Sequence, residues 1–234
     1  ALSAAGGADA APVAAASLGQ VYRVRLPSGA DVALKVQRPS TLPNVLRDLY
    51  ILRRWGAFLE WSKSHLMPLH RGYDVALVDA FAAAACQELD YINEADNLER
   101  FRRDVVPRCG GRVYAPAVLS EYSSRRVLAM EWVEGRRLVD CEPEVIARLT
   151  PVGVECFLTQ LLELGFFHAD PHPGNLLVTP DGRLALLDFG LCAVVPPQAP
   201  ARLTLAVVHM MRGDVPGLVA DSAALGFLPA AYAA

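Results

Sequence analysis

The stretch that decides the fold is His168-Ala-Asp-Pro-His-Pro-Gly-Asn175-Leu-Leu-Val-Thr-Pro-Asp-Gly-Arg-Leu-Ala-Leu-Leu-Asp188-Phe-Gly190. Within it, two short apolar runs at 176–178 and 184–187 flank Thr-Pro-Asp-Gly, a combination that favours a turn. The sequence therefore predicts a β-hairpin with Asn175 before its first strand and Asp188 after its second. Both residues then lie at the same open end of the hairpin.

The polar residues around this hairpin have the spacing of a phosphoryl-transfer site. Asp170, Asn175 and Asp188 match the pattern H-x-D-x-x-x-x-N followed by D-F-G. In that pattern the first Asp orients or deprotonates the attacking hydroxyl, while the Asn and the second Asp hold Mg²⁺ on the nucleotide phosphates. We therefore expect ATP and Mg²⁺ as cofactors, Asp170 as a catalytic residue, and Asn175 and Asp188 as metal ligands. D-F-G alone is a common turn, so the prediction depends on the hairpin that joins the two oxygen ligands.

A transition-metal cluster of His168, Asp170 and His172 is an alternative, because alternating positions of an extended segment share a face. Pro171 and Pro173 rule out a helix that would place both histidines one turn apart. No Cys or further His nearby completes a set of four ligands. We interpret His168 as a residue that packs in the loop and braces it by hydrogen bonding.

Lys35 is the second indication of a phosphoryl-transfer site. The chain has 22 Lys and Arg residues, but only Lys35 and Lys63 are lysines. Lys35 lies in the strand-like run Val-Ala-Leu-Lys-Val-Gln at 32–37, which is similar to the V-A-I-K strand whose lysine contacts the α- and β-phosphates and pairs with a helix glutamate. An exposed strand lysine is the alternative.

Acidic residues are concentrated in the run 87–101, where apolar residues recur at helical spacing. We expect one long amphipathic helix here, beginning near Asp79. Asp90 and Glu94 are four residues apart and would share one face, so if Glu94 reaches Lys35, Asp90 would face the same cleft. A solvated acidic face is the alternative interpretation.

The segment Ala14-Ala-Ala-Ser-Leu-Gly-Gln-Val21 occupies the place where a phosphate-covering glycine loop would be expected. Its only glycine is Gly19, and alanine does not readily adopt the positive φ angles that let backbone amides approach phosphates closely. Nucleotide contact in this segment should therefore differ from that of a protein kinase.

Three stretches together resemble the ABC1/UbiB family of atypical protein-kinase-like proteins, also called aarF-domain kinases. The stretches are the alanine-rich segment 14–21, the run Glu88-Leu-Asp-Tyr-Ile-Asn-Glu94, and the two loops 168–175 and 188–190. The resemblance implies that Lys35 contacts the phosphates with Glu94 as its partner. It also implies nucleotide-site positions at Ala14, Ala15, Ala16, Ser17, Glu88 and Asp90, and a hinge at Glu131 and Val133 whose backbone holds the adenine.

The implied fold class is α+β, a bilobal protein-kinase-like fold. We predict a low-complexity lead-in at 1–13, a small β-rich lobe with inserted helices at 14–133, and a truncated helical lobe at 134–234. The inserted helix at 42–61 would pack against this lobe or form a lipid-facing or regulatory surface. Further helices are expected at 152–167, starting at Thr150-Pro151 and ending at Gly165, and at 199–211 and 215–224. The chain is interpreted as a fragment, because the family's Lys-x-Gly-Gln element is not in it.

The composition excludes some functions. A net charge of −3 does not indicate a basic nucleic-acid surface. The five cysteines are odd in number and lack paired C-x-x-C spacing, so reduced thiols are expected. No uninterrupted apolar span that could cross a bilayer is expected, because the run 152–167 contains Glu155 and Glu163.

The resemblance implies an ATP-binding atypical kinase or ATPase that supports isoprenoid-quinone or other prenyl-lipid metabolism. Its implied partners are prenyl-lipid or quinone-pathway proteins and a membrane surface, with no nucleic acid. Its implied location is an organelle, a plastid rather than a mitochondrion, peripheral to the membrane. The alternatives are a small-molecule phosphotransferase of the aminoglycoside or choline kinase kind, a catalytically silent nucleotide-binding scaffold, and a metalloprotein unrelated to nucleotides.

Overall fold

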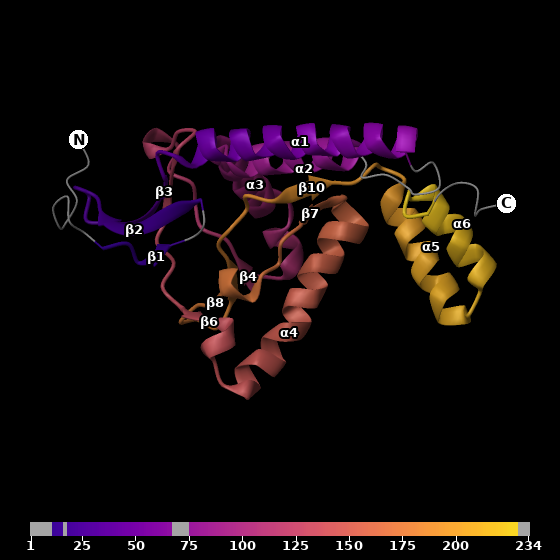
Figure 1. Cartoon of the computed structure of the whole chain (residues 1–234). Helices are drawn as coiled ribbons and strands as arrows, with labels where there is room; N and C mark the ends of the chain where they lie inside the picture. Colours follow the sequence, from indigo (N-terminus) through magenta and orange to yellow (C-terminus); the bar gives the residue numbers. More distant parts are fainter. Residues whose placement is uncertain (1–10, 16–17, 67–74, 229–234) are drawn as a thin grey trace. The chain divides into compact units, whose positions relative to one another are not determined.

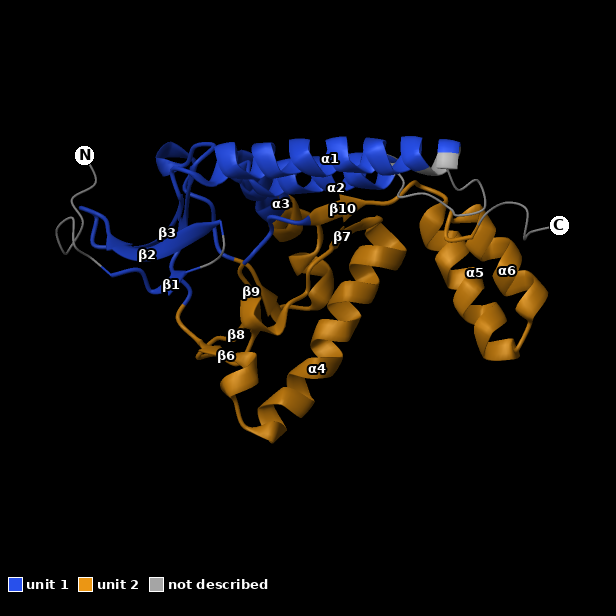
Figure 2. Ribbon diagram, in the orientation of Figure 1, with its two compact units in different colours: residues 1–99, 116–133, 188–191 blue, residues 100–115, 134–187, 192–234 orange. Residues whose placement is uncertain are grey.

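The computed structural model describes residues 11–15, 18–66 and 75–228 (Figure 1). The chain forms two compact units (Figure 2). Unit 1 comprises residues 1–99, 116–133 and 188–191, and unit 2 comprises 100–115, 134–187 and 192–234. The predicted boundary at residue 133 stays a prediction; the compact units place 100–115 with the second half of the chain and 188–191 with the first.

Unit 1 contains a four-stranded antiparallel sheet in the order β1-β2-β3-β5. The strands are β1 (Ala14–Ala15), β2 (Gly19–Arg25), β3 (Asp31–Gln37) and β5 (Val127–Glu131). A tight turn joins β2 to β3, and Gly29 supplies the positive φ of 87° that the turn requires. Buried apolar side chains, among them Leu26, Val32 and Ala129, form the core beneath the sheet.

Leu128 is fully buried in β5 on the face of the sheet opposite Ala129, so it gives a test of the packing on that second face. Replacing it with alanine removes buried methyl groups and leaves a cavity, so we expect Leu128→Ala to lower the free energy of unfolding by about 2–5 kcal/mol. Leu77→Ala is the matched control, because Leu77 is 66% exposed on a surface helix and should change stability by about 0.5 kcal/mol or less. Urea unfolding of both variants measures the difference, and equal losses would contradict the assignment of Leu128 to the core.

The helices of unit 1 are α1 (Thr41–Leu66), α2 (Val75–Glu88) and the first part of α3 (Tyr91–Asp104), with a 3₁₀ turn, η2, at Ser120–Tyr122. α1 and α2 pack side by side (Figure 1). The inserted helix expected at 42–61 is therefore present as α1. It extends a few residues further at its carboxyl end than the prediction.

The single helix predicted over 87–101 is wrong. α2 ends at Glu88 and α3 begins at Tyr91, with Asp90 between them. The Asp90 carboxylate accepts a hydrogen bond from the Ile92 N–H at 3.1 Å, as an N-cap does, so a new helix starts there. Asp90 consequently does not share a helical face with Glu94.

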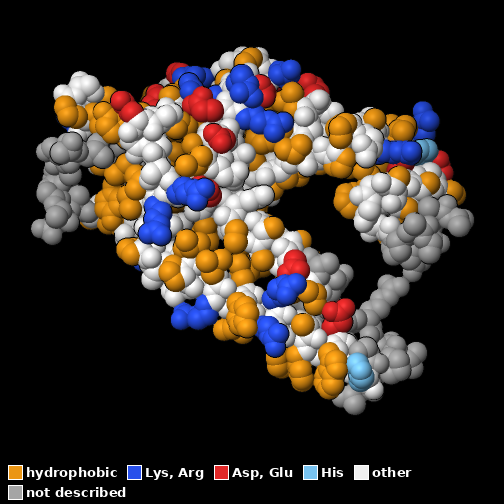
Figure 3. All heavy atoms as spheres, turned by 90° about the horizontal axis from the view of Figure 1, so that it is seen from above, with side chains coloured by type: hydrophobic (Ala, Val, Ile, Leu, Met, Phe, Trp, Pro, Cys, Tyr) orange, Lys and Arg blue, Asp and Glu red, His pale blue; other side chains and the backbone are white. Residues whose placement is uncertain are grey.

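α1 carries an exposed aromatic surface. Trp55, Phe58 and Trp61 are each more than half exposed, and their ring centroids follow one another at 5.6 and 6.1 Å. Figure 3 views the molecule from the side on which α1 lies in Figure 1, and it shows hydrophobic side chains interspersed with both basic and acidic ones. Contiguous exposed apolar groups of this kind are typical of interaction surfaces.

Unit 2 consists of one small mixed sheet, a two-stranded ladder and several helices. The sheet has the order β4-β9-β8-β6, and β7 pairs with β10. The elements are η1 (Val106–Cys109), β4 (Val113–Tyr114), β6 (Arg136–Arg137), η3 (Leu138–Asp140), α4 (Pro143–Leu158), the π-helical turn η4 (Thr159–Leu164), β7 (Phe166–His168), η5 (Pro173–Asn175), β8 (Leu176–Val178), β9 (Leu184–Leu186), β10 (Cys192–Val194), α5 (Ala199–Arg212) and α6 (Val215–Ala224).

The predicted hairpin is confirmed. β8 and β9 pair antiparallel with Leu176 opposite Leu186, and the turn between them places Gly182 at a φ of 81°. Pairing continues past the strands, because the Leu187 N–H donates to the Asn175 carbonyl at 3.1 Å. Asn175 therefore lies opposite the residue that immediately precedes Asp188.

The predicted start of the helix at 152–167 is wrong. α4 begins at Pro143, and Pro151 lies inside it. Proline is favourable in the first helical turn, where its missing N–H is not needed, and Pro143 fills that position. The predicted end is confirmed at Gly165, which has a φ of 60°. The two helices expected near the carboxyl end are present as α5 and α6.

The stretch Pro143–Leu164 differs from the expectation that no segment could span a bilayer. Among the described residues it is the one helix of sufficient length and hydropathy, with 22 residues and a mean hydropathy of 1.4 in its most apolar window. Glu155 within it forms an ion pair with Arg112 at 2.7 Å. One helix of this kind is weak evidence for a membrane span.

Candidate functional site

Three side chains from separate segments of unit 1 form a charged cluster. Lys35 on β3 donates from Nζ to both carboxylate oxygens of Glu94 at 2.8 Å. The Asp188 Oδ1 lies 3.4 Å from the same Nζ. Glu94 lies in the first turn of α3, and its side chain is only 2% exposed. The ion pair expected between Lys35 and Glu94 is thus present, and Asp188 joins it.

Burial and neighbouring charges shift the pKa values of the three groups in different directions. Burial disfavours the Lys35 ammonium, but the carboxylates of Glu94 and Asp188 outweigh it and raise the pKa of Lys35. Burial raises the pKa of Glu94 to about 7, and the charge of Asp188 adds to this effect while Lys35 opposes it. For Asp188, burial is outweighed by the Lys35 charge and the Gly190 N–H, which lower the pKa of its carboxyl. One cation therefore faces two carboxylates.

The raised pKa of Glu94 predicts a pH dependence of stability. A carboxyl whose pKa rises on folding, here from 4.5 to about 7, stabilises the fold fully below 4.5 and loses that contribution as the pH rises through 7. We expect the unfolding free energy of the wild type, relative to Glu94→Gln, to decrease between about pH 4.5 and 7, because glutamine cannot ionise. Urea unfolding across this range measures the difference. A constant difference would contradict the burial of a titrating group.

Burial and hydrogen bonds within unit 1 anchor the segment Asp188-Phe-Gly190. Phe189 is fully buried, and its carbonyl accepts a hydrogen bond from the Asn97 side chain at 3.1 Å. The Gly190 N–H donates to Asp188 Oδ1 at 3.0 Å. A Cβ on Gly190 would lie 3.3 Å from that oxygen and 3.4 Å from Cγ of Glu88, so glycine allows a close approach of both acidic side chains.

Tyr91 lies beneath the lysine and was not identified from the sequence. The Lys35 Nζ lies 5.2 Å from the centre of its ring, in the range of a cation–π contact. The tyrosine hydroxyl is buried without a hydrogen-bond partner among the described residues, and burial raises its pKa. A Cβ on Gly19 would lie 2.5 Å from this hydroxyl, so the single glycine of the alanine-rich segment is required for packing against Tyr91.

The remaining nucleotide-site positions are only partly described. Ala14 and Ala15 form β1 and pair with β2, whereas Ala16 and Ser17 lie outside the described residues. Asp90 lies 3.7 Å from Arg125. The Glu131 carboxylate accepts a hydrogen bond from the Ala117 N–H at 3.3 Å, and Val133 follows β5 by two residues. Their contacts with a nucleotide stay predictions.

Unit 2 holds Asp170 and Asn175 in one compact loop. The Asp170 N–H donates to His168 Nδ1 at 3.2 Å, and its carbonyl accepts from the His172 N–H at 2.7 Å. The His172 Nδ1 in turn accepts from the Gly174 N–H at 3.0 Å, and the Asn175 N–H donates to the His172 carbonyl at 2.9 Å. The histidines therefore shape the backbone around Asp170, as the interpretation of His168 as a bracing residue predicts.

Gln160 supports this loop and was not identified from the sequence. It is fully buried in η4, and its Oε1 accepts a hydrogen bond from the His168 N–H at 2.9 Å. Its Nε2 donates to the Cys156 carbonyl at 3.1 Å. Gln160 lies within the π-helical turn, which a scan for 3.6-residue periodicity does not detect.

The chemistry of the predicted metal ligands fits Mg²⁺. Asp188 is 38% exposed with a lowered pKa, and Asn175 offers a carboxamide oxygen, so both are the hard oxygen donors that Mg²⁺ prefers. Within the described ranges no group of three or more His, Cys, Asp and Glu side chains is arranged to hold a metal. The structure thus offers no support for the alternative of a histidine-rich metal cluster.

An antiparallel sheet with a lysine paired to a helix glutamate, an Asp-Phe-Gly segment and a His-x-Asp-x-x-x-x-Asn loop define a protein-kinase-like protein. The chain belongs to the ABC1 atypical kinase-like domain family, whose model matches residues 7–222. The predicted family and the α+β kinase-like fold class are therefore confirmed.

Several relatives are known. The chain is 43% identical over 230 residues to an uncharacterized protein of Synechocystis, covering 94% of this chain and 39% of that protein. It is 42% identical over 224 residues to the chloroplastic Protein ACTIVITY OF BC1 COMPLEX KINASE 3 of Arabidopsis thaliana, covering 93% of this chain and 30% of that protein. The chain thus spans between 30% and 39% of the length of these relatives.

A solved structure is also similar. The complex of Rv3197 with erythromycin from Mycobacterium tuberculosis matches with a TM-score of 0.64 and 30% identity. The match covers 91% of this chain and 53% of that one. The fold of this chain is therefore similar to about half of that structure.

Proposed function

We propose that this chain is the nucleotide-binding region of an ATP-dependent atypical kinase or ATPase that requires Mg²⁺. The observation that carries the proposal is the Lys35–Glu94–Asp188 cluster. A partly buried lysine held by a glutamate from α3 is the arrangement that kinase-like proteins use to position nucleotide phosphates. Lys35 is one of only two lysines in the chain, which favours a specific role over a general surface charge.

Each residue of the proposed site would have a distinct role. Glu94 orients the Lys35 ammonium, which contacts the phosphates. Asp188 and Asn175 would hold Mg²⁺, and the bound metal would neutralise charge that develops on the phosphates. Asp170 would orient or accept the proton of the attacking hydroxyl or water, because its exposed carboxylate lies in a loop fixed by two histidines.

A lysine substitution tests the proposal. We expect Lys35→Met to weaken binding of ATP with Mg²⁺ about 10- to 100-fold, because it removes one charge-assisted hydrogen bond to phosphate and leaves Glu94 without its partner. Lys63→Met is the matched control, since it removes the other lysine of the chain, and it should bind ATP as the wild type does. Calorimetric titration of ATP measures both. Equal affinities of the two variants would contradict the assignment.

We further propose a role in isoprenoid-quinone or related prenyl-lipid metabolism at a plastid-type membrane. Curated plant relatives at 42–43% identity are chloroplastic, which supports the plastid. The exposed aromatic residues of α1, together with Arg47 and Arg54 on the same helix, suit a membrane interface, where Trp anchors and basic side chains gather. ATP hydrolysis should then increase when phenolic quinone precursors and membranes are added. Unchanged hydrolysis would contradict the proposed role in prenyl-lipid metabolism.

A further inference from the structure

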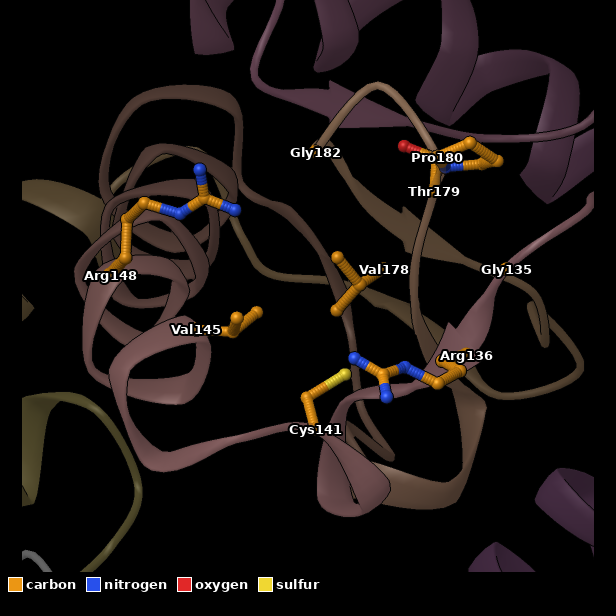
Figure 4. A pocket seen from close by; sticks show the side chains of 9 residues that line it. All are labelled: Gly135, Arg136, Cys141, Val145, Arg148, Val178, Thr179, Pro180 and Gly182. Carbon is orange, nitrogen blue, oxygen red and sulfur yellow. The ribbon is translucent and has the colours of Figure 1, made fainter.

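A cavity of about 400 Å³ lies in unit 2, lined by residues of β6, α4 and the turn between β8 and β9. Figure 4 shows the guanidinium groups of Arg136 and Arg148 on two sides of this space, with the side chains of Val145 and Val178 between them. None of its lining residues has a role in the proposed function. The volume is sufficient for a small organic molecule.

The charge around the cavity is positive. Its lining contains two arginines and no acidic side chain. Arg136 donates to both oxygens of Glu142, at 3.2 and 2.8 Å, so its charge is already compensated and its position is fixed. Arg148 forms no hydrogen bond or ion pair with any described residue. A guanidinium without a counter-ion therefore faces the cavity.

The hairpin turn between β8 and β9 lies against Arg148 at the cavity. Gly182 has a φ of 81°, and a Cβ there would lie 3.4 Å from Nη2 of Arg148, so the turn lies directly against the guanidinium. Asp181 in the same turn is engaged elsewhere. Its oxygens accept hydrogen bonds from the Thr179 hydroxyl at 2.5 Å and from Arg183 at 2.7 Å.

We propose that this cavity binds a small molecule that carries a carboxylate or phosphate group on an apolar body. Guanidinium groups bind both oxyanions through paired, charge-assisted hydrogen bonds. Arg148 would supply the uncompensated charge, and Arg136 would offer a second contact from the opposite side. The valines provide an apolar surface for the body of the ligand.

Two probes test the proposal and separate the two oxyanions. Phenyl phosphate and benzoate are titrated into the protein, and calorimetry gives their affinities. We expect at least one probe to bind the wild type and to bind Arg148→Gln at least about tenfold more weakly, because a charge-assisted contact is lost. Arg137→Gln is the matched control, since Arg137 neighbours Arg136 in β6, pairs with Asp140 at 2.7 Å and does not line the cavity. It should leave the affinity unchanged.

Hydrogen exchange locates the bound probe and gives a readout independent of nucleotide. Protection should appear at 145–148 and 178–182. Equal affinities of the wild type and Arg148→Gln would overturn the proposal, as would the absence of binding of either probe. Loss of binding in Lys35→Met but not in Arg148→Gln would also overturn it, because the anion would then occupy the nucleotide site.

Discussion

Asp188→Asn is expected to abolish the dependence of ATP binding on Mg²⁺. The substitution preserves the size of the side chain but removes the negative charge that a hard divalent cation requires. The Gly190 N–H can still donate to an oxygen of asparagine, and Lys35 keeps its bonds to Glu94, so the local structure should persist. We expect the affinity for ATP with Mg²⁺ to fall about 10- to 100-fold, and the affinity without metal to change little.

The decisive measurement compares ATP titrations with Mg²⁺ and with a chelator. In the wild type, chelation should weaken binding; in Asp188→Asn, the two titrations should agree. Asp79→Asn is the matched control, because Asp79 is an exposed carboxylate on α2 that pairs with Arg53. Tight binding of ATP without metal, unaffected by Asp188→Asn, would contradict the role of Asp188 as a magnesium ligand.

The hairpin and the strand that carries Lys35 could be predicted because their signals are local. Thr179-Pro-Asp-Gly182 between two apolar runs specifies a turn by residue type, and the structure has that turn. Lys35 could be placed on a strand from its neighbours alone, whereas its pairing with Glu94 was implied by the family resemblance. The cluster then follows from the fold class rather than from any one spacing.

Other features could not be predicted from the sequence. They depend on a side-chain hydrogen bond that competes with the helical pattern, or on tertiary packing. The spacing of apolar residues from Leu89 to Phe101 fits one helix, but the Asp90 side chain bonds to the backbone and starts a new helix. The burial of Tyr91 against Gly19 depends on the approach of α3 to β2, and the support of His168 by Gln160 depends on a π-helical turn. No pattern in the sequence specifies either contact.

Asp170→Asn is expected to leave ATP affinity unchanged and to remove turnover. The Asp170 carboxylate has no hydrogen-bond partner among the described residues, and the loop around it is held by backbone N–H groups and by His168 and His172. Asparagine should therefore fit without disturbing the loop. It cannot accept a proton, so the rate of ATP hydrolysis or transfer should fall by about 10²- to 10⁴-fold.

The comparison of affinity with rate separates an enzyme from a scaffold. A loss of rate at constant ATP affinity shows that Asp170 acts on the reacting groups, because loss of uniform binding would weaken the affinity and leave the turnover rate unchanged. Asp181→Asn is the matched control: it removes a carboxylate from the hairpin turn in the same unit, where Asp181 pairs with Arg183, and should keep the wild-type rate. Unchanged turnover in Asp170→Asn would mean that another residue is the base. Undetectable turnover in the wild type, with ATP binding retained, would favour a protein that senses nucleotide and transfers nothing.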